Sequence, residues 1–174
     1  MQKIMDNTYY AAIYLRLSKE DGDFSSSGEK KESNSIANQR KLIEDFLKQH
    51  PEVVLTQEFC DDGFTGANFD RPDFQRMIEL VKQRKINCIV VKDLSRLGRN
   101  YIETGEFLEK ICPFFGIRFI AVNDNFDTDT VEANGQLSVS LSNIINDYYA
   151  KDISRKVSSA LRHNNFKKAV YLVC

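Results

Sequence analysis

The sequence predicts an α/β fold with a mostly parallel sheet of four to five strands, helices on both faces and a long C-terminal helix. Three observations lead to this prediction. Short apolar runs alternate with amphipathic helical stretches, two of the runs are almost continuously apolar, and one helical pattern is longer than a domain of this size is wide. Alternation of this kind indicates right-handed crossovers between parallel strands. With 174 residues, 42% of them hydrophobic, the chain can bury one such core.

Four short runs are typical of strands. They cover residues 9–17, 53–59, 86–91 and 117–122. The last two runs read INCIVV and IRFIAV, which is the near-continuous apolar pattern of strands covered on both faces.

Three helices are predicted between these strands. The first covers residues 35–49 and places five apolar side chains near one stripe, namely Ile36, Leu42, Ile43, Phe46 and Leu47. The second begins at Pro72, because proline suits the first turn of a helix, and the third covers residues 101–115.

A much longer helical pattern starts near Val131 and continues for some 30 residues, which is roughly 45 Å of helix. Such a helix must leave its own core, so we expect it to pack on another chain. The alternative is a kinked helix that folds back on its own sheet. We therefore divide the chain into a core, residues 1–130, and a continuous segment, residues 131–174, with the oligomerisation helix and a basic tail.

Charge is distributed unevenly along the chain. From Lys151 to the end, six Lys or Arg residues face one acid, Asp152, which gives +5; the net charge of −1 then leaves −6 for the first 150 residues. This asymmetry indicates an anionic partner for the C-terminal end, although a solvated helix face would have the same composition.

Several classes of protein are disfavoured. The N-terminus lacks the order of a signal peptide, and no apolar run approaches 18 residues, so we expect a soluble, cytoplasmic protein with no membrane partner. Four widely spaced cysteines and two histidines offer no zinc pattern, and we expect no metal or cofactor. Residues 19–32, rich in Ser, Gly and charge, are expected to form a mobile loop.

One serine and four arginines follow successive strands. Strand alternation places Arg16 and Ser18 on one face, with their Cα atoms about 7 Å apart. Arg71 follows the second strand, and Arg96 and Arg99 follow the third, where one helical turn would point both the same way. The carboxyl ends of parallel strands meet at one edge, so the four arginines should converge on Ser18. Because guanidinium groups bind phosphate oxygens bidentately and keep their charge, this set indicates phosphoryl transfer.

The same residues carry a family resemblance. Arg16-Leu17-Ser18, the stretch DDGFTGANFDRP around Arg71, and SRLGR at 95–99 resemble the three catalytic motifs of the serine site-specific DNA recombinases of the resolvase and invertase family. The similarity spans residues 10–162, and the extended loop before Ser33 resembles the large serine recombinases of conjugative transposons and phages. It implies a resolvase-like catalytic core without the DNA-binding region that follows in the family, since FKKAVYLVC does not resemble that continuation.

The resemblance implies a role for each matching residue. Ser18 would be the nucleophile, and Arg16, Arg71, Arg96 and Arg99 would bind the phosphate and stabilise its transition state.

Four further residues would support the site. Asn34 and Gln39 resemble active-site glutamines of the family, with Asn34 a departure. Ser95 replaces an aspartate that precedes the arginine in many relatives, and Asp93, two residues earlier, is placed to substitute for it. The long helix would form the dimer and reach DNA through its basic residues, which are Lys151, Arg155, Lys156 and Arg162.

The implied reaction is cleavage and rejoining of double-stranded DNA. Ser18 would attack a phosphate, release a 3′-hydroxyl and hold the 5′ end as a phosphoserine ester, inside a tetramer assembled from homodimers on DNA. Such chemistry integrates or excises mobile elements in bacteria and phages, and the covalent bond conserves the phosphodiester energy, so neither ATP nor metal is required.

Two alternatives remain open. A non-catalytic remnant that only dimerises would lower recombination by an intact partner without forming its own DNA adduct. A small phosphate-binding α/β enzyme would bind nucleotides in calorimetry, although the first strand lacks the glycine-rich turn usual in such enzymes.

Overall fold

The computed structural model describes residues 8–17, 34–62, 71–98, 101–133, 146 and 153–154. None of the helices in these ranges is long and apolar enough to cross a membrane. The chain divides into two compact units, Met1–Leu137 and Ser138–Cys174, and almost all of the described residues belong to the first unit. The helix expected from about Val131 therefore lies mostly outside the described residues, apart from residues 131–133, 146 and 153–154, and stays a prediction.

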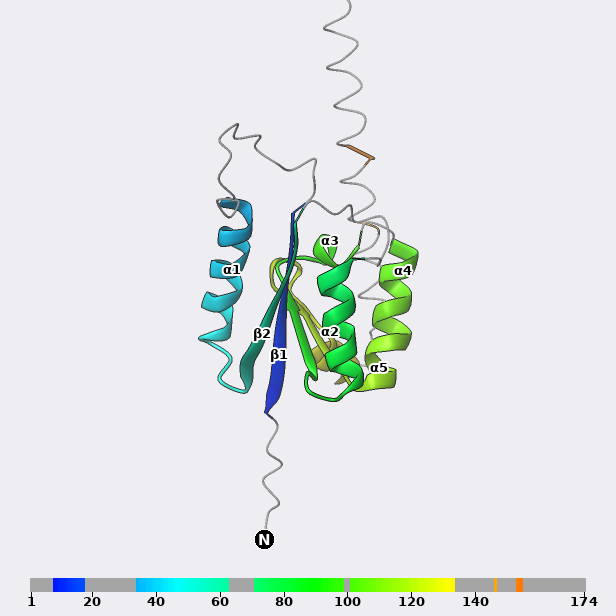
Figure 1. Cartoon of the computed structure of the whole chain (residues 1–174). Coiled ribbons are helices and arrows are strands. Elements are labelled where there is room, and N and C mark those ends of the chain that lie inside the picture. Colours follow the sequence, from blue (N-terminus) through cyan, green and yellow to red (C-terminus); the bar gives the residue numbers. More distant parts are fainter. Residues whose placement is uncertain are drawn as a thin grey trace, which may run out of the picture. The chain divides into compact units, whose positions relative to one another are not determined.

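The first unit is built on a five-stranded sheet with the order β2-β1-β3-β4-β5 (Figure 1). Its strands are β1 (Tyr9–Leu17), β2 (Val53–Asp62), β3 (Cys88–Val91), β4 (Arg118–Ala121) and β5 (Phe126–Asp127). The first four strands are parallel and β5 runs antiparallel to β4. Because β1 lies between β2 and β3 and is parallel to both, the carboxyl ends of these three strands lie at the same edge of the sheet.

Helices cover both faces of this sheet, as the α/β prediction requires. Figure 1 shows α1 on one side of β1, and α2, α4 and α5 on the other. The helices are α1 (Asn34–Leu47), α2 (Pro72–Lys82), α3 (Leu94–Leu97), α4 (Tyr101–Glu106), the π-helical segment η1 (Phe107–Ile111), α5 (Cys112–Phe115), the 3₁₀ turn η2 (Val122–Asp124) and α6 (Thr128–Ala133). The fold class predicted from the sequence is confirmed.

The side chains of β1 alternate between the two faces of the sheet, and each face has its own buried cluster. Its odd-numbered residues from Ala11 to Leu17 are buried with Ile36 and Ile43 of α1. Its even-numbered residues face the opposite way, where the Tyr14 ring packs edge-on against Phe74 of α2 at 5.4 Å. Arg16 shares the face of Tyr14 because strand side chains alternate with a period of two.

The helix expected at 101–115 differs from a regular α-helix. Residues 107–111 are π-helical, and the N–H of Cys112 donates to the carbonyl of Phe107, five residues earlier. Pro113, which has no N–H, follows directly. The segment ends at Gly116, whose φ of +65° is a left-handed conformation that suits glycine.

The short antiparallel strand β5 was not predicted from the sequence. Arg118, at the start of β4, pairs with Asp127 of β5 at 2.7 Å and with Glu52 at 3.4 Å. The hydroxyl of Thr128 accepts a hydrogen bond from the Phe119 N–H at 2.8 Å. These contacts hold β5 and the start of α6 against β4. Because β5 has only two residues, one of them polar, the sequence shows no alternating strand pattern there.

Burial of Cys88, in the middle of the sheet, raises the pKa of its thiol to about 12. The folded protein therefore holds this proton while the unfolded chain releases it near 9.0. Stability from this site is complete below the unfolded pKa and is lost as the pH rises from there toward the folded value.

We predict that, between about pH 8 and about pH 10, the free energy of unfolding of the wild-type protein falls by about 1 kcal/mol more than that of Cys88→Ala. Urea denaturation across this range measures the difference. Cys60→Ala removes a half-buried thiol and keeps Cys88, so it should follow the wild-type pH dependence. Identical slopes for wild type and Cys88→Ala would contradict the prediction.

Candidate active site

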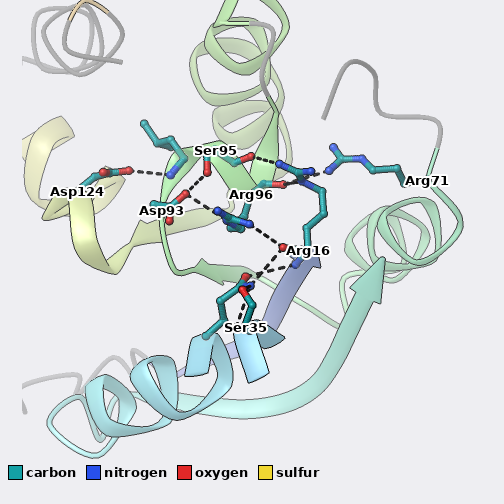
Figure 2. Close-up of polar contacts among 9 residues, drawn as sticks. Arg16, Ser35, Arg71, Asp93, Ser95, Arg96 and Asp124 are labelled. Atoms are coloured by element: carbon teal, nitrogen blue, oxygen red, sulfur yellow. Dashed lines mark hydrogen bonds and ion pairs between the residues drawn. The ribbon is translucent and has the colours of Figure 1, made fainter. Parts of the chain in front are cut away.

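Arg16 lies at the carboxyl end of β1 and is 1% exposed. Its guanidinium donates from Nη2 to the carbonyl of Ser95 at 2.7 Å and from Nε to the carbonyl of Arg96 at 3.2 Å. These carbonyls lie at the end of the four-residue helix α3, where helix carbonyls have no partner within the helix. Arg16 therefore ties the end of β1 to α3 (Figure 2).

Arg71 reaches the same end of α3 and is fully buried. Its Nη1 donates to the Tyr14 hydroxyl at 2.9 Å and to the Arg96 carbonyl at 3.1 Å, and its Nη2 donates to the Leu97 carbonyl. The guanidinium also lies 4.8 Å from the centre of the Phe74 ring. Burial lowers the pKa of Arg71, and nearby Tyr14 and Asp61 act in the opposite direction.

Local sequence explains how Arg71 enters this position. A residue before proline favours extended backbone, and Arg71, with φ −131° and ψ 126°, directly precedes Pro72 at the start of α2. Arg71 in this extended conformation directly precedes α2, and its side chain reaches the end of β1.

Arg96 completes the convergence of three arginines. Its Nη1 donates to the carbonyl of Arg16 at 2.8 Å, and its Nε lies 3.4 Å from the carboxylate of Asp93. The hydroxyl of Ser95 donates to the same oxygen of Asp93. At the other end of α3, the Leu94 N–H donates to the carboxylate of Asp124 at 2.7 Å.

Gln39 of α1 is 1% exposed and binds the main chain of Arg16. Its amide oxygen accepts from the Arg16 N–H at 3.4 Å, and its amide nitrogen donates to the Arg16 carbonyl at 3.3 Å and to the Ser35 carbonyl at 3.2 Å. The side chain thus fixes the end of β1, immediately before Leu17 and Ser18.

Tyr14 and Asp61 belong to the same network, although sequence reasoning did not select them. The Tyr14 hydroxyl donates to Asp61 at 2.9 Å, and Asp61 also accepts the N–H groups of Asp73 and Phe74 at 3.1 and 3.0 Å. Asp61 therefore caps α2 and, through Tyr14, reaches Arg71. Burial raises the pKa of Tyr14 well above its ordinary value, opposed by the charge of Arg71. The sequence signal that could have identified Asp61 is an acidic residue at the end of the strand that precedes α2.

The structure brings together six of the predicted site residues, which are Arg16, Gln39, Arg71, Asp93, Ser95 and Arg96. Ser18 and Arg99 lie outside the described residues, as do the basic residues of the C-terminal segment, Lys151, Arg155, Lys156 and Arg162. Asn34 begins α1, and only its backbone is described.

One local expectation was wrong. The helical turn that was to present Arg96 and Arg99 together ends at Leu97, and Gly98 is extended with φ −169° and ψ 158°. The guanidinium groups of Arg16 and Arg71 donate to main-chain carbonyls of α3, and Arg71 also donates to the Tyr14 hydroxyl. Their role as phosphate-binding residues stays a prediction. In this conformation they shape the site and concentrate positive charge beside the end of β1.

Most of this chain matches the model of a known protein family. Residues 11–169 match the model of the family described as Resolvase, N terminal domain. The chain belongs to this family. Its members are serine recombinases, which cleave and rejoin DNA strands.

Two solved structures and one curated relative resemble this family member. The chain is 25% identical to the N-terminal catalytic domain of TP901-1 integrase, with a TM-score of 0.63, over 82% of this chain and 97% of that domain. A resolvase family site-specific recombinase from Streptococcus pneumoniae shares the fold, with 20% identity and a TM-score of 0.57 over 91% and 99% of the two chains. The transposon Tn917 resolvase of Enterococcus faecalis is 35% identical over 69 residues, 38% of this chain. That match spans 34% of the length of the relative.

We predict that Tyr14→Phe destabilises the protein by about 1–3 kcal/mol, because it removes a buried hydroxyl that bridges Asp61 and Arg71. Urea denaturation measures the change. Tyr10→Phe is the matched control, since Tyr10 is 53% exposed and its loss of a hydroxyl should change stability by less than about 0.5 kcal/mol. Equal stabilities for the two variants would show that the bridge contributes nothing.

Proposed function

We propose that this chain is the catalytic domain of a serine site-specific recombinase that cleaves and rejoins double-stranded DNA, with Ser18 as the nucleophile. The observation that carries the proposal is the convergence of Arg16, Arg71 and Arg96 at the carboxyl end of β1, two residues before Ser18. Three guanidinium groups in a largely buried cluster create a strongly positive environment, which suits a phosphodiester.

In the proposed reaction, the Oγ of Ser18 attacks the phosphorus of a DNA phosphate, and the bond from phosphorus to the 3′ oxygen breaks. The proton given up by Ser18 is balanced by the proton that the departing 3′ oxygen takes up as it becomes a hydroxyl. The 5′ end stays on the protein as a phosphoserine ester. Rejoining reverses these steps with a new 3′-hydroxyl, which restores Ser18.

The arginines have two tasks in this mechanism. Their positive charge lowers the energy of the pentacoordinate phosphate and favours ionisation of the serine hydroxyl. Arg16 and Arg71 also hold α3 against β1, which places Arg96 beside the strand end that leads to Ser18. Arg99, one residue after Gly98, is proposed to contact the phosphate directly.

Gln39 and Asn34 are proposed to support the nucleophile from the start of α1. Gln39 binds both main-chain polar groups of Arg16, so a buried amide holds the end of β1 two residues before Ser18. Positioning of this kind supplies much of the rate enhancement in phosphoryl transfer.

The assembly is proposed to be a homodimer that forms a tetramer on DNA, through the helix expected in residues 131–174. Its basic residues are proposed to bind the DNA backbone; they are Lys151, Arg155, Lys156 and Arg162. Integration or excision of a mobile element is the reaction proposed for the whole recombinase.

A suicide substrate with a nicked strand tests the chemistry, because the cleaved fragment diffuses away and the protein–DNA adduct accumulates. We predict that wild-type protein forms this adduct and that Ser18→Ala forms none. Ser26→Ala, another serine-to-alanine change, should keep the wild-type yield. An adduct formed by Ser18→Ala would exclude Ser18 as the nucleophile, and a wild-type protein without any adduct would contradict the proposed activity.

Salt dependence tests the DNA contacts of the basic residues. Each phosphate contact contributes about 0.9 to the slope of log K against log salt concentration. We predict that Lys156→Ala lowers the magnitude of this slope by about 0.9 in a fluorescence anisotropy titration with duplex DNA. Lys82→Ala, on the exposed end of α2, is the charge-matched control and should leave the slope unchanged. Equal slopes for the two variants would remove Lys156 from the interface.

A further inference from the structure

Asp93 contacts two other residues of the site, Ser95 and Arg96. One carboxylate oxygen, Oδ1, accepts the hydroxyl of Ser95 and lies 3.4 Å from Nε of Arg96 (Figure 2). Arg96 in turn donates from Nη1 to the main-chain carbonyl of Arg16 at 2.8 Å. A continuous polar chain therefore runs from Asp93 through Arg96 to the residue two positions before Ser18.

Shielding from solvent distinguishes this ion pair from the other i,i+3 pairs of the described residues. The side chains of Arg96 and Asp93 are 15% and 19% exposed. The corresponding values are 72% and 53% for Lys48 with Asp45, and 49% and 58% for Lys82 with Glu79. Exposed pairs of this kind contribute little, whereas a shielded carboxylate beside an arginine orients it more strongly.

The main chain around Asp93 is held from several directions. Asp93 is extended, with φ −153° and ψ 161°, and its carbonyl accepts the N–H of Arg96 at 3.0 Å. The next residue, Leu94, is fixed by Asp124, and the preceding Lys92 carbonyl accepts the Asn123 N–H at 2.8 Å. The carboxylate therefore starts from a fixed point, so its contact with Arg96 can determine where the guanidinium lies.

Resting on the proposed function, we propose that Asp93 is a positioning residue for strand cleavage, which holds the guanidinium of Arg96 against the end of β1. Asp93 acts through Arg96 and does not touch the DNA. The negative charge is the essential property, and Ser95 keeps it in place by donating its hydroxyl to the same oxygen.

A carboxylate on a neighbouring residue should be able to replace that of Asp93. The Ser95 hydroxyl is within hydrogen-bond contact of Asp93 Oδ1, so a carboxylate on residue 95 would lie close to where the Asp93 carboxylate lies now. Asp93→Asn removes the charge with little change of shape. Combining it with Ser95→Asp returns one negative charge to the same place from a neighbouring residue.

The experiment measures the rate of covalent adduct formation on the suicide substrate for four proteins, which are wild type, Asp93→Asn, Ser95→Ala and the double variant Asp93→Asn with Ser95→Asp. We expect Asp93→Asn to be slower by about tenfold or more, Ser95→Ala to be slowed less, and the double variant to recover most of the lost rate. Asp45→Asn removes the carboxylate of an exposed i,i+3 pair and should keep the wild-type rate.

An NMR measurement separates this inference from the proposed function. The Nε–H signal of Arg96, assigned with Arg96→Lys, should shift and exchange faster with solvent in Asp93→Asn than in wild type, and it should return toward the wild-type position in the double variant. This readout needs no DNA, so it applies even if the wild-type protein forms no adduct or if a variant is too unstable for long reactions.

Two results would overturn the proposal. The first is an Asp93→Asn rate equal to that of Asp45→Asn, or an Arg96 Nε–H signal that does not respond to Asp93→Asn. The second is a double variant that folds with the wild-type melting temperature and is as slow as Asp93→Asn, because a purely structural role for Asp93 predicts no rescue by a carboxylate at position 95.

Discussion

The buried guanidinium of Arg71 is the group on which the rest of the site depends. A cation taken out of water is costly unless hydrogen bonds and nearby negative charge offset the loss of hydration. Arg71 meets this requirement with two main-chain carbonyls of α3, the Tyr14 hydroxyl and, through that hydroxyl, the carboxylate of Asp61. The two carbonyls lie on α3, Tyr14 on β1 and Asp61 on β2, and Arg71 itself directly precedes α2. Satisfying one charge therefore fixes β1, β2, α2 and α3 together.

Arg16 adds a second cation at the same end of α3, where the Arg96 carbonyl accepts from both arginines. Helix α3 has only four residues, and its last carbonyls would otherwise be left without partners in a partly buried place. The two arginines supply donors to these oxygens, and the oxygens supply the polar contacts that the arginines need. The positive cluster and the helix end are therefore mutually dependent, which explains why a short helix is stable beside three guanidinium groups.

This dependence has a functional consequence for a serine recombinase. In the proposed reaction, a phosphate at the end of β1 meets positive charge that is already held in place, so little reorganisation is needed when negative charge develops on the phosphorus. Arg96 lies in the outer part of the cluster, with its guanidinium between the Arg16 carbonyl and Asp93. The same contacts that stabilise the fold thus orient the Arg96 guanidinium against the end of β1.

The sequence by itself determined the alternation of the first four strands with helices, the start of α2 at Pro72 and the convergence of Arg16, Arg71 and Arg96. These features follow from hydrophobic periodicity, from the restriction that proline imposes and from the geometry of parallel strands, all of which are local or depend only on chain order. Only the tertiary structure decided that Tyr14 and Asp61 support Arg71, that Asp93 contacts Arg96 and that α3 ends before residue 99. Tyr14, Asp61 and Arg71 come from elements far apart in the chain. Asp93 and Arg96 are only three residues apart, but the segment that carries them is held by Asp124 and by the Arg16 carbonyl. A buried charge needs polar partners from several elements at once, and that condition is set by distances in space that no spacing along the sequence specifies.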